Sequence, residues 1–149
     1  MAKFNLNELE TIASHCFKDF NTFWNAFCNF KSDYNFFTLY MDRNSKSDIK
    51  LVPSAYSKSL NSLLVNYTHD DKGLEMVFCI YYIVRQIILD LHHWNTPLFT
   101  NEEHKELLNY LVTYEYVDID TFCNEFISCS SVHLEIRTKI NELLKEDIE

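Results

Sequence analysis

The chain has 149 residues, of which 47% are hydrophobic, 15% aromatic and 23% charged. This composition is that of an ordinary globular domain and excludes a chain that is disordered over most of its length. One glycine and two prolines argue against an all-β fold, which needs many turns, and against a glycine-rich nucleotide-binding loop. We therefore expect a single all-α domain over residues 1–149, a bundle of six to seven helices around a central apolar helix at about residues 74–94.

The first residues and the cysteines predict a cytoplasmic protein. The first ten residues lack the basic segment and apolar stretch of a secretory signal. The most apolar run, Met76 to Val84, is about half as long as a bilayer crossing requires. The number of cysteines is odd and no two form a CxxC pair, so we expect reduced thiols in the core and neither disulfides nor metal ligands. They are Cys16, Cys28, Cys79, Cys123 and Cys129.

An apolar seam runs along the first 41 residues at helical spacing. Its members follow one another in steps of three and four, as on one face of a helix. They are Leu9, Ala13, Cys16, Phe20, Phe23, Phe27, Phe30, Tyr34, Phe37 and Met41. The seam fits one helix from about Asn7 to Met41, or two helices separated near Lys31 to Asn35, where Ser, Asp and Asn compete for backbone hydrogen bonds. We favour two helices, because uninterrupted helices of that length are uncommon in single domains.

The middle of the chain predicts a loop, a helix, a turn and then the most apolar segment. Asp42 to Val52 is polar and predicts the longest loop, after which Pro53 and Ser54 mark the start of a helix. The apolar residues of that helix are Tyr56, Leu60, Leu63, Leu64 and Tyr67. Thr68 to Gly73 predicts a connecting turn. Leu74 to Trp94 is apolar on nearly every side, which is typical of a helix surrounded by others.

Three further helices are expected after Pro97. Thr100 and Glu103 have the spacing of a capping box, which predicts a helix start there. A second helix is expected after Tyr116 to Asp118, and a third from about Ser131. The apolar residues are Leu107, Leu108, Leu111 and Val112 in the first, Ile119, Phe122, Cys123, Phe126 and Ile127 in the second, and Val132, Ile136, Ile140, Leu143 and Leu144 in the third.

The net charge of −9 lies entirely in the second half of the chain. Residues 1–73 contain eight acidic and eight basic residues, whereas residues 74–149 contain fourteen acidic and five basic ones. Within residues 102–125 a single base, Lys105, accompanies Glu102, Glu103, Glu106, Glu115, Asp118, Asp120 and Glu125. Such a segment repels nucleic acid and anionic lipid and attracts a cationic protein surface. The alternative is that these acids form solvated helix faces and only keep the domain soluble.

Few residue patterns in the chain suit catalysis or metal binding. There is no GxSxG motif of a serine hydrolase and no phosphate-binding loop. A di-iron bundle needs two Glu-x-x-His helices, and the nearest match is a single Asp90-x-x-His93. We therefore expect a protein that is not an enzyme and that has no catalytic residue, cofactor or metal.

One polar pair in the expected central helix resembles a catalytic signature. Arg85 and His92 are seven residues apart, so they lie on nearly the same side of a helix. The pair resembles the Arg/His signature of HEPN-type helical ribonucleases, with Gln86 in the place of their additional polar residue. The resemblance implies that Arg85 stabilises a phosphate and that His92 positions or protonates the reacting oxygen. This pair lies in mid-helix, however, whereas the family places it near a helix start. The alternative is that Arg85, Asp90 and His93 form one polar strip of a buried helix, satisfied by its neighbours.

Acidic and aromatic residues coincide in residues 102–125, which points to a protein-binding face. The expected face consists of Glu102, Glu103, Glu106, Tyr110, Tyr114, Tyr116, Asp118 and Asp120. We expect an inhibitor, such as an immunity protein, that neutralises a basic partner such as a nuclease toxin and binds neither nucleic acid nor membrane. The alternatives are a helical adaptor with a hydrophobic groove, similar in architecture to small viral death-regulator bundles, and a HEPN-like ribonuclease.

Overall fold

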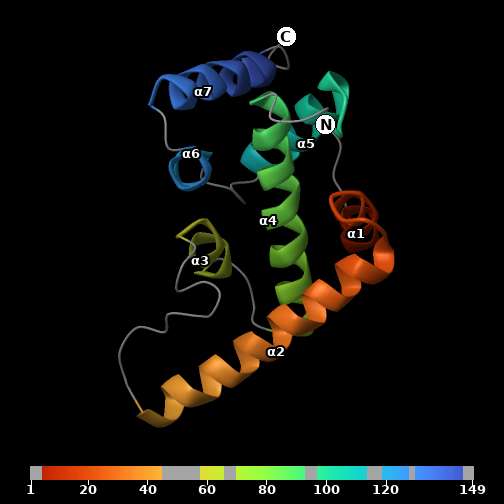
Figure 1. Ribbon diagram of the computed structural model, residues 1–149, viewed down its shortest axis with the longest axis vertical. Coiled ribbons are helices and arrows are strands. Elements are labelled where there is room, and N and C mark those ends of the chain that lie inside the picture. Colours follow the sequence, from red (N-terminus) through yellow and green to blue (C-terminus); the bar gives the residue numbers. More distant parts are fainter. Residues whose placement is uncertain are drawn as a thin grey trace.

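All the secondary structure elements in the described part of the chain are helices in the computed structural model, which confirms the predicted all-α fold (Figure 1). The structure describes residues 5–44, 58–65, 70–92, 97–113, 119–127 and 130–145. The helices are α1 (Leu6–Ser14), α2 (Phe20–Asn44), α3 (Lys58–Val65), α4 (Asp71–Leu91), α5 (Asn101–Thr113), α6 (Ile119–Phe126) and α7 (Ser130–Lys145). In Figure 1, α4 stands upright between α1 and α3, with α2 across its lower end and α7 across its upper end. It contacts each of the other helices.

The N-terminal seam forms two helices, as favoured, but the break lies earlier than the predicted one near Lys31 to Asn35. α1 ends at Ser14, and α2 begins at Phe20 and continues through the expected break at residues 31–35. Asp19 determines this boundary, because its Oδ1 accepts a hydrogen bond from the backbone N–H of Thr22 at 2.8 Å and so caps the first turn of α2. The change of direction leaves Phe20 48% exposed, although it belongs to the seam.

The central segment begins three residues earlier than predicted. Asp70 caps α4, and its Oδ1 accepts a hydrogen bond from the N–H of Gly73 at 2.8 Å. Residues 71–73, which the sequence assigned to a turn, therefore form the first turn of the helix. At the other end Lys139 of α7 donates to the carbonyl oxygen of Leu91 at 3.0 Å, a favourable place for a cation. The expected end of this helix, Trp94, lies outside the described residues.

The remaining predicted elements agree with the structure where it describes them. The capping box at α5 is confirmed, because the backbone N–H of Thr100 donates to Glu103 at 2.8 Å and that of Glu103 to Thr100 Oγ1 at 3.1 Å. α6 and α7 begin within one residue of the predicted starts. α3 is observed from Lys58, whereas Pro53 and Ser54 lie outside the described residues, as does the predicted loop beyond Asn44.

Aromatic side chains form much of the core between α1, α2 and α4. Phe78 of α4 lies at the centre, with its ring 4.9 to 6.2 Å from five others. These are Phe17, Phe23, Phe27, Phe30 and Tyr82.

No helix within the described segments is both long and apolar enough to cross a bilayer.

The cysteines are distributed between the core and its edge. Cys79 and Cys123 are buried and free, as expected for reduced core thiols. Cys16 and Cys28 are also free but half-buried, and Cys16 packs against the core from its edge. Cys129 lies outside the described residues.

Candidate functional site

The described residues of the predicted binding face lie on two helices, α5 and α6. Three of them are exposed acids on the first two turns of α5, namely Glu102, Glu103 and Glu106. Asp120 is exposed on α6. The residues of this face that lie outside the described ranges are Tyr114, Tyr116 and Asp118.

Tyr110 belongs to the core, contrary to its predicted place on that face. Its side chain is 1% exposed and is among the largest that are fully buried. Tyr110 and Glu103 of the expected face are seven residues apart, a spacing that puts both on one side of a helix. Both residues do lie in one helix, α5, but the burial of its side chains changes along the helix axis. Residues 107–111 are all buried, because α5 packs there against α4 and α7.

Several acids of the same segment have partners within the fold. Glu103 caps the first turn of α5. Asp120 forms an ion pair with Arg137 of α7. Glu125 accepts two hydrogen bonds, each 3.0 Å long, from the backbone N–H and the Oγ of Ser59 in α3. Part of the negative charge in this segment therefore has a structural use.

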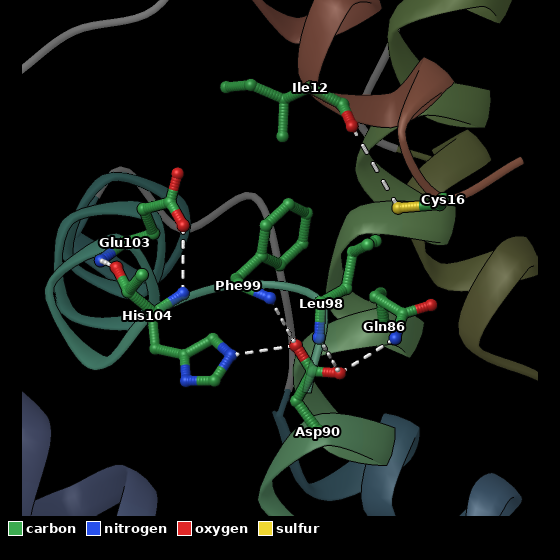
Figure 2. A network of polar contacts seen from close by, with 9 residues as sticks. Ile12, Cys16, Gln86, Asp90, Leu98, Phe99, Glu103 and His104 are labelled. Carbon is green, nitrogen blue, oxygen red and sulfur yellow. Dashed lines mark hydrogen bonds and ion pairs between the residues drawn. The ribbon is translucent and has the colours of Figure 1, made fainter. Parts of the chain in front are cut away.

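Asp90 is the centre of a buried polar network at the end of α4 (Figure 2). Its carboxylate accepts from Gln86 Nε2 at 2.8 Å and from the backbone N–H of Leu98 at 3.0 Å through Oδ1. Through Oδ2 it accepts from the N–H of Phe99 and from Nε2 of His104, both at 3.0 Å. The network joins α4, the segment that precedes α5, and α5 itself.

The hydrogen bonds to Asp90 keep it ionised. Burial alone would raise the pKa of this carboxyl group, but the N–H groups of Leu98 and Phe99, together with His104 and Gln86, bring the pKa below its ordinary value. The interpretation of Asp90 as a polar residue satisfied by its neighbours is therefore right. Its partners do not include Arg85, with which the sequence interpretation grouped it.

His104 is the member of this network that the sequence analysis did not identify. Its side chain is buried, and Nδ1 has no hydrogen-bond partner among the described residues. An Asp–His pair can orient a general base, but that chemistry needs a nucleophile within reach. The thiol drawn near the network, Cys16, has its pKa raised to about 12 by burial and by the charge of Asp90. The spacing could have revealed His104, since it lies three residues before Leu107 on the apolar face of α5.

The Arg85–His92 pair lies at the C-terminal end of α4, which is neither the predicted mid-helix position nor a helix start. Arg85 is within the last two turns, and His92 is the C-cap, with its backbone N–H donating to the carbonyl oxygen of Ile88 at 3.0 Å. Within the described ranges there is no group of three or more His, Cys, Asp or Glu side chains that could hold a metal ion.

An open cavity of about 340 Å³ lies between α2, α3 and α4. Its lining consists of Ala26, Asn29, Phe30 and Asp33 from α2, Leu60 from α3, and Phe78, Tyr81 and Tyr82 from α4. Most of the lining residues are apolar or aromatic, whereas Asn29 and Asp33 are exposed residues that add polar groups to the lining. The sequence interpretation assigned Leu60 and the apolar residues of α4 to helix faces, but periodicity alone does not show that three such faces leave a space between them.

Comparison with known proteins returns no relative: no family model matches the sequence, and no curated protein or solved structure matches it significantly. The cavity and the exposed acids are therefore the features from which a function can be inferred.

Proposed function

We propose that this chain is a non-enzymatic protein-binding module that seats an amphipathic helix of a basic partner in the cavity between α2, α3 and α4. The observation that supports this proposal is the composition of the cavity, whose lining is mainly apolar and aromatic side chains and includes the exposed carboxylate of Asp33. Helical ligands bind apolar grooves through side chains at helical spacing. A basic residue beside those apolar anchors would meet Asp33, and the net charge of −9 attracts a cationic partner from a distance.

The proposed role is inhibition. A partner whose helix is seated in the cavity cannot use that helix for its other contacts, so binding alone is enough to neutralise it. No catalytic group is required for such a role. An acidic inhibitor of this kind is the function expected from the sequence, with the contact surface moved from α5 to the cavity.

A second candidate surface is the exposed acidic start of α5, favoured by Glu102 and Glu106, whose carboxylates lie on the outside of the first two turns. Buried aromatic anchors dominate the affinity of most protein interfaces, and Tyr110 is not available as one. We therefore expect this surface to speed the approach of a basic partner more than to hold it.

The test uses a helical peptide of about 16 leucine and lysine residues with leucines at positions i, i+3, i+4 and i+7. We expect the wild-type chain to bind it, and Ala26→Phe, which fills the cavity, to abolish binding. Asp33→Lys is expected to weaken binding about tenfold. The matched control is Glu142→Lys, which reverses an exposed carboxylate on α7, outside the cavity and outside the acidic start of α5. Binding that survives Ala26→Phe, or that is equally strong when every lysine of the peptide is glutamate, contradicts the proposal.

A further inference from the structure

α6 lines no part of the cavity, yet it supports the α3 wall through Glu125. Both carboxylate oxygens accept from Ser59, Oε1 from the backbone N–H and Oε2 from Oγ, at 3.0 Å each. Ser59 is fully buried in the first turn of α3, where backbone N–H groups lack helical partners and negative charge is stabilising. The next residue, Leu60, lines the cavity. The carboxylate therefore fixes the end of α3 that forms the cavity wall.

α6 also contacts the α4 wall. Tyr81 lines the cavity, and the rings of Phe122 and Phe126 lie 6.0 and 5.9 Å from its ring. Figure 1 shows α6 next to α3 on the same side of α4, and α6 contacts both helices. The short helix α6 thus packs against two of the three helices that line the cavity, α3 and α4.

We propose that Glu125 is a positioning residue for the helix-binding cavity: from α6 it fixes α3 at the distance from α2 and α4 that a seated helix requires. This inference rests on the proposed function. Hydrogen bonds to an ionised carboxylate are about twice as strong as those between neutral groups. A wall that is already in place need not be ordered when the ligand binds, which favours affinity. Without the carboxylate only a fraction of the molecules hold α3 in position, and the apparent affinity falls by that fraction.

The experiment compares Glu125→Ala and Glu125→Gln with the control Glu142→Ala, which removes an exposed carboxylate from α7. With the leucine–lysine peptide we expect binding about tenfold weaker for Glu125→Ala and unchanged for the control. Glu125→Gln is expected to lie between them, because its amide oxygen still accepts from the N–H of Ser59. Amide hydrogen exchange in residues 59–65 should be faster in Glu125→Ala, and should slow again when the peptide is saturating, with no change in α5.

The outcomes separate this inference from the proposal on which it rests. A merely structural role of Glu125 would lower the melting temperature and leave the peptide affinity of the folded protein unchanged, and that result overturns the inference alone. Unchanged amide hydrogen exchange in α3 of Glu125→Ala also overturns this inference alone. Failure of the wild-type chain to bind the peptide overturns the proposed function and this role with it. If Glu125→Ala does not fold, Glu125→Gln and Ser59→Ala, which each keep one hydrogen bond, decide the question with smaller expected effects.

Discussion

The carboxylate of Asp90 accepts hydrogen bonds from four protein donors in place of water. Its removal therefore leaves these donors without a full set of acceptors. In Asp90→Asn the amide cannot accept from all four donors, so the N–H of Leu98, the buried N–H of Phe99 and the imidazole of His104 compete for one oxygen. We expect a loss of roughly 2 to 3 kcal/mol in the free energy of unfolding, measured with urea. Gln86→Ala, which removes a single donor, is the control and is expected to cost less. Equal stability of Asp90→Asn and wild type contradicts the structural role of the network.

The same carboxyl group makes stability depend on pH in a definite direction. Its pKa in the folded chain is lowered from the ordinary value of 3.8, so the unfolded chain binds this proton more readily. The stabilisation is therefore present above about pH 4 and is lost as the pH falls through the folded-state pKa. Urea titrations on both sides of pH 4 should show that wild type loses more stability on acidification than Asp90→Asn does. Parallel losses would assign acid sensitivity to other carboxylates.

The buried thiols are expected to react slowly while the chain is folded. Burial raises the pKa of Cys123 to about 11 and raises that of Cys79 as well. The thiolate is the reactive species, and burial also keeps reagents out. Mass spectrometry after brief treatment with iodoacetamide at neutral pH should find both cysteines unmodified in the native chain and modified in urea. Rapid labelling of Cys79 under native conditions would show that the core around α4 opens easily.

Among the elements, helical periodicity predicted buried faces well and helix ends less well. Phe23, Phe27 and Phe30 are buried as the seam requires. The break was misplaced because a cluster of polar residues was given more weight than a single capping residue. Ser32 and Asp33 are exposed on α2 and leave its backbone uninterrupted, whereas Asp19 alone caps a new helix.

α4 is the element whose truncation should be most costly. Ile87 is fully buried within it, so Ile87→Ala removes apolar contacts and leaves a cavity. We expect a loss of roughly 2 to 5 kcal/mol in the free energy of unfolding. Leu134→Ala on α7 is the control, because that side chain is 68% exposed and its truncation should change stability little. An unchanged free energy of unfolding in Ile87→Ala would show that the main core does not lie around α4.

The candidate site needed the tertiary structure because its parts come from three separate segments. Phe30 and Leu60 were correctly predicted on apolar helix faces. Whether such faces close on one another or leave a cavity depends on helix angles and side-chain volumes, which periodicity does not determine. The same reason explains the buried pair of Asp90 and His104, since the two lie on different helices and meet only when α5 packs against α4.

Across the whole molecule, the sequence shows where the negative charge is but not which charges are accessible. Glu103, Asp120 and Glu125 lie in the acidic segment, and each has a partner in the fold. Glu102 and Glu106 remain as exposed carboxylates on α5. Fewer carboxylates are therefore available to contact a partner than the sequence suggests. The electric field of the net charge of −9 still acts at long range.

We expect the acidic start of α5 and the carboxylate of Asp33 to affect the kinetics of peptide binding differently. Reversing Glu102 and Glu106 together to Lys, with the capping residue Glu103 left intact, should slow association with the leucine–lysine peptide severalfold at low salt and leave dissociation unchanged. The difference should fade in salt, because exposed charges are screened beyond about 10 Å at 0.1 M. Asp33→Lys should also speed dissociation, since this charge lies at the cavity that holds the helix. Stopped-flow fluorescence at several salt concentrations measures both rates. If the α5 double variant speeds dissociation more than Asp33→Lys does, the acidic start of α5 holds the partner, because only a group in contact with the bound peptide can change how fast it leaves.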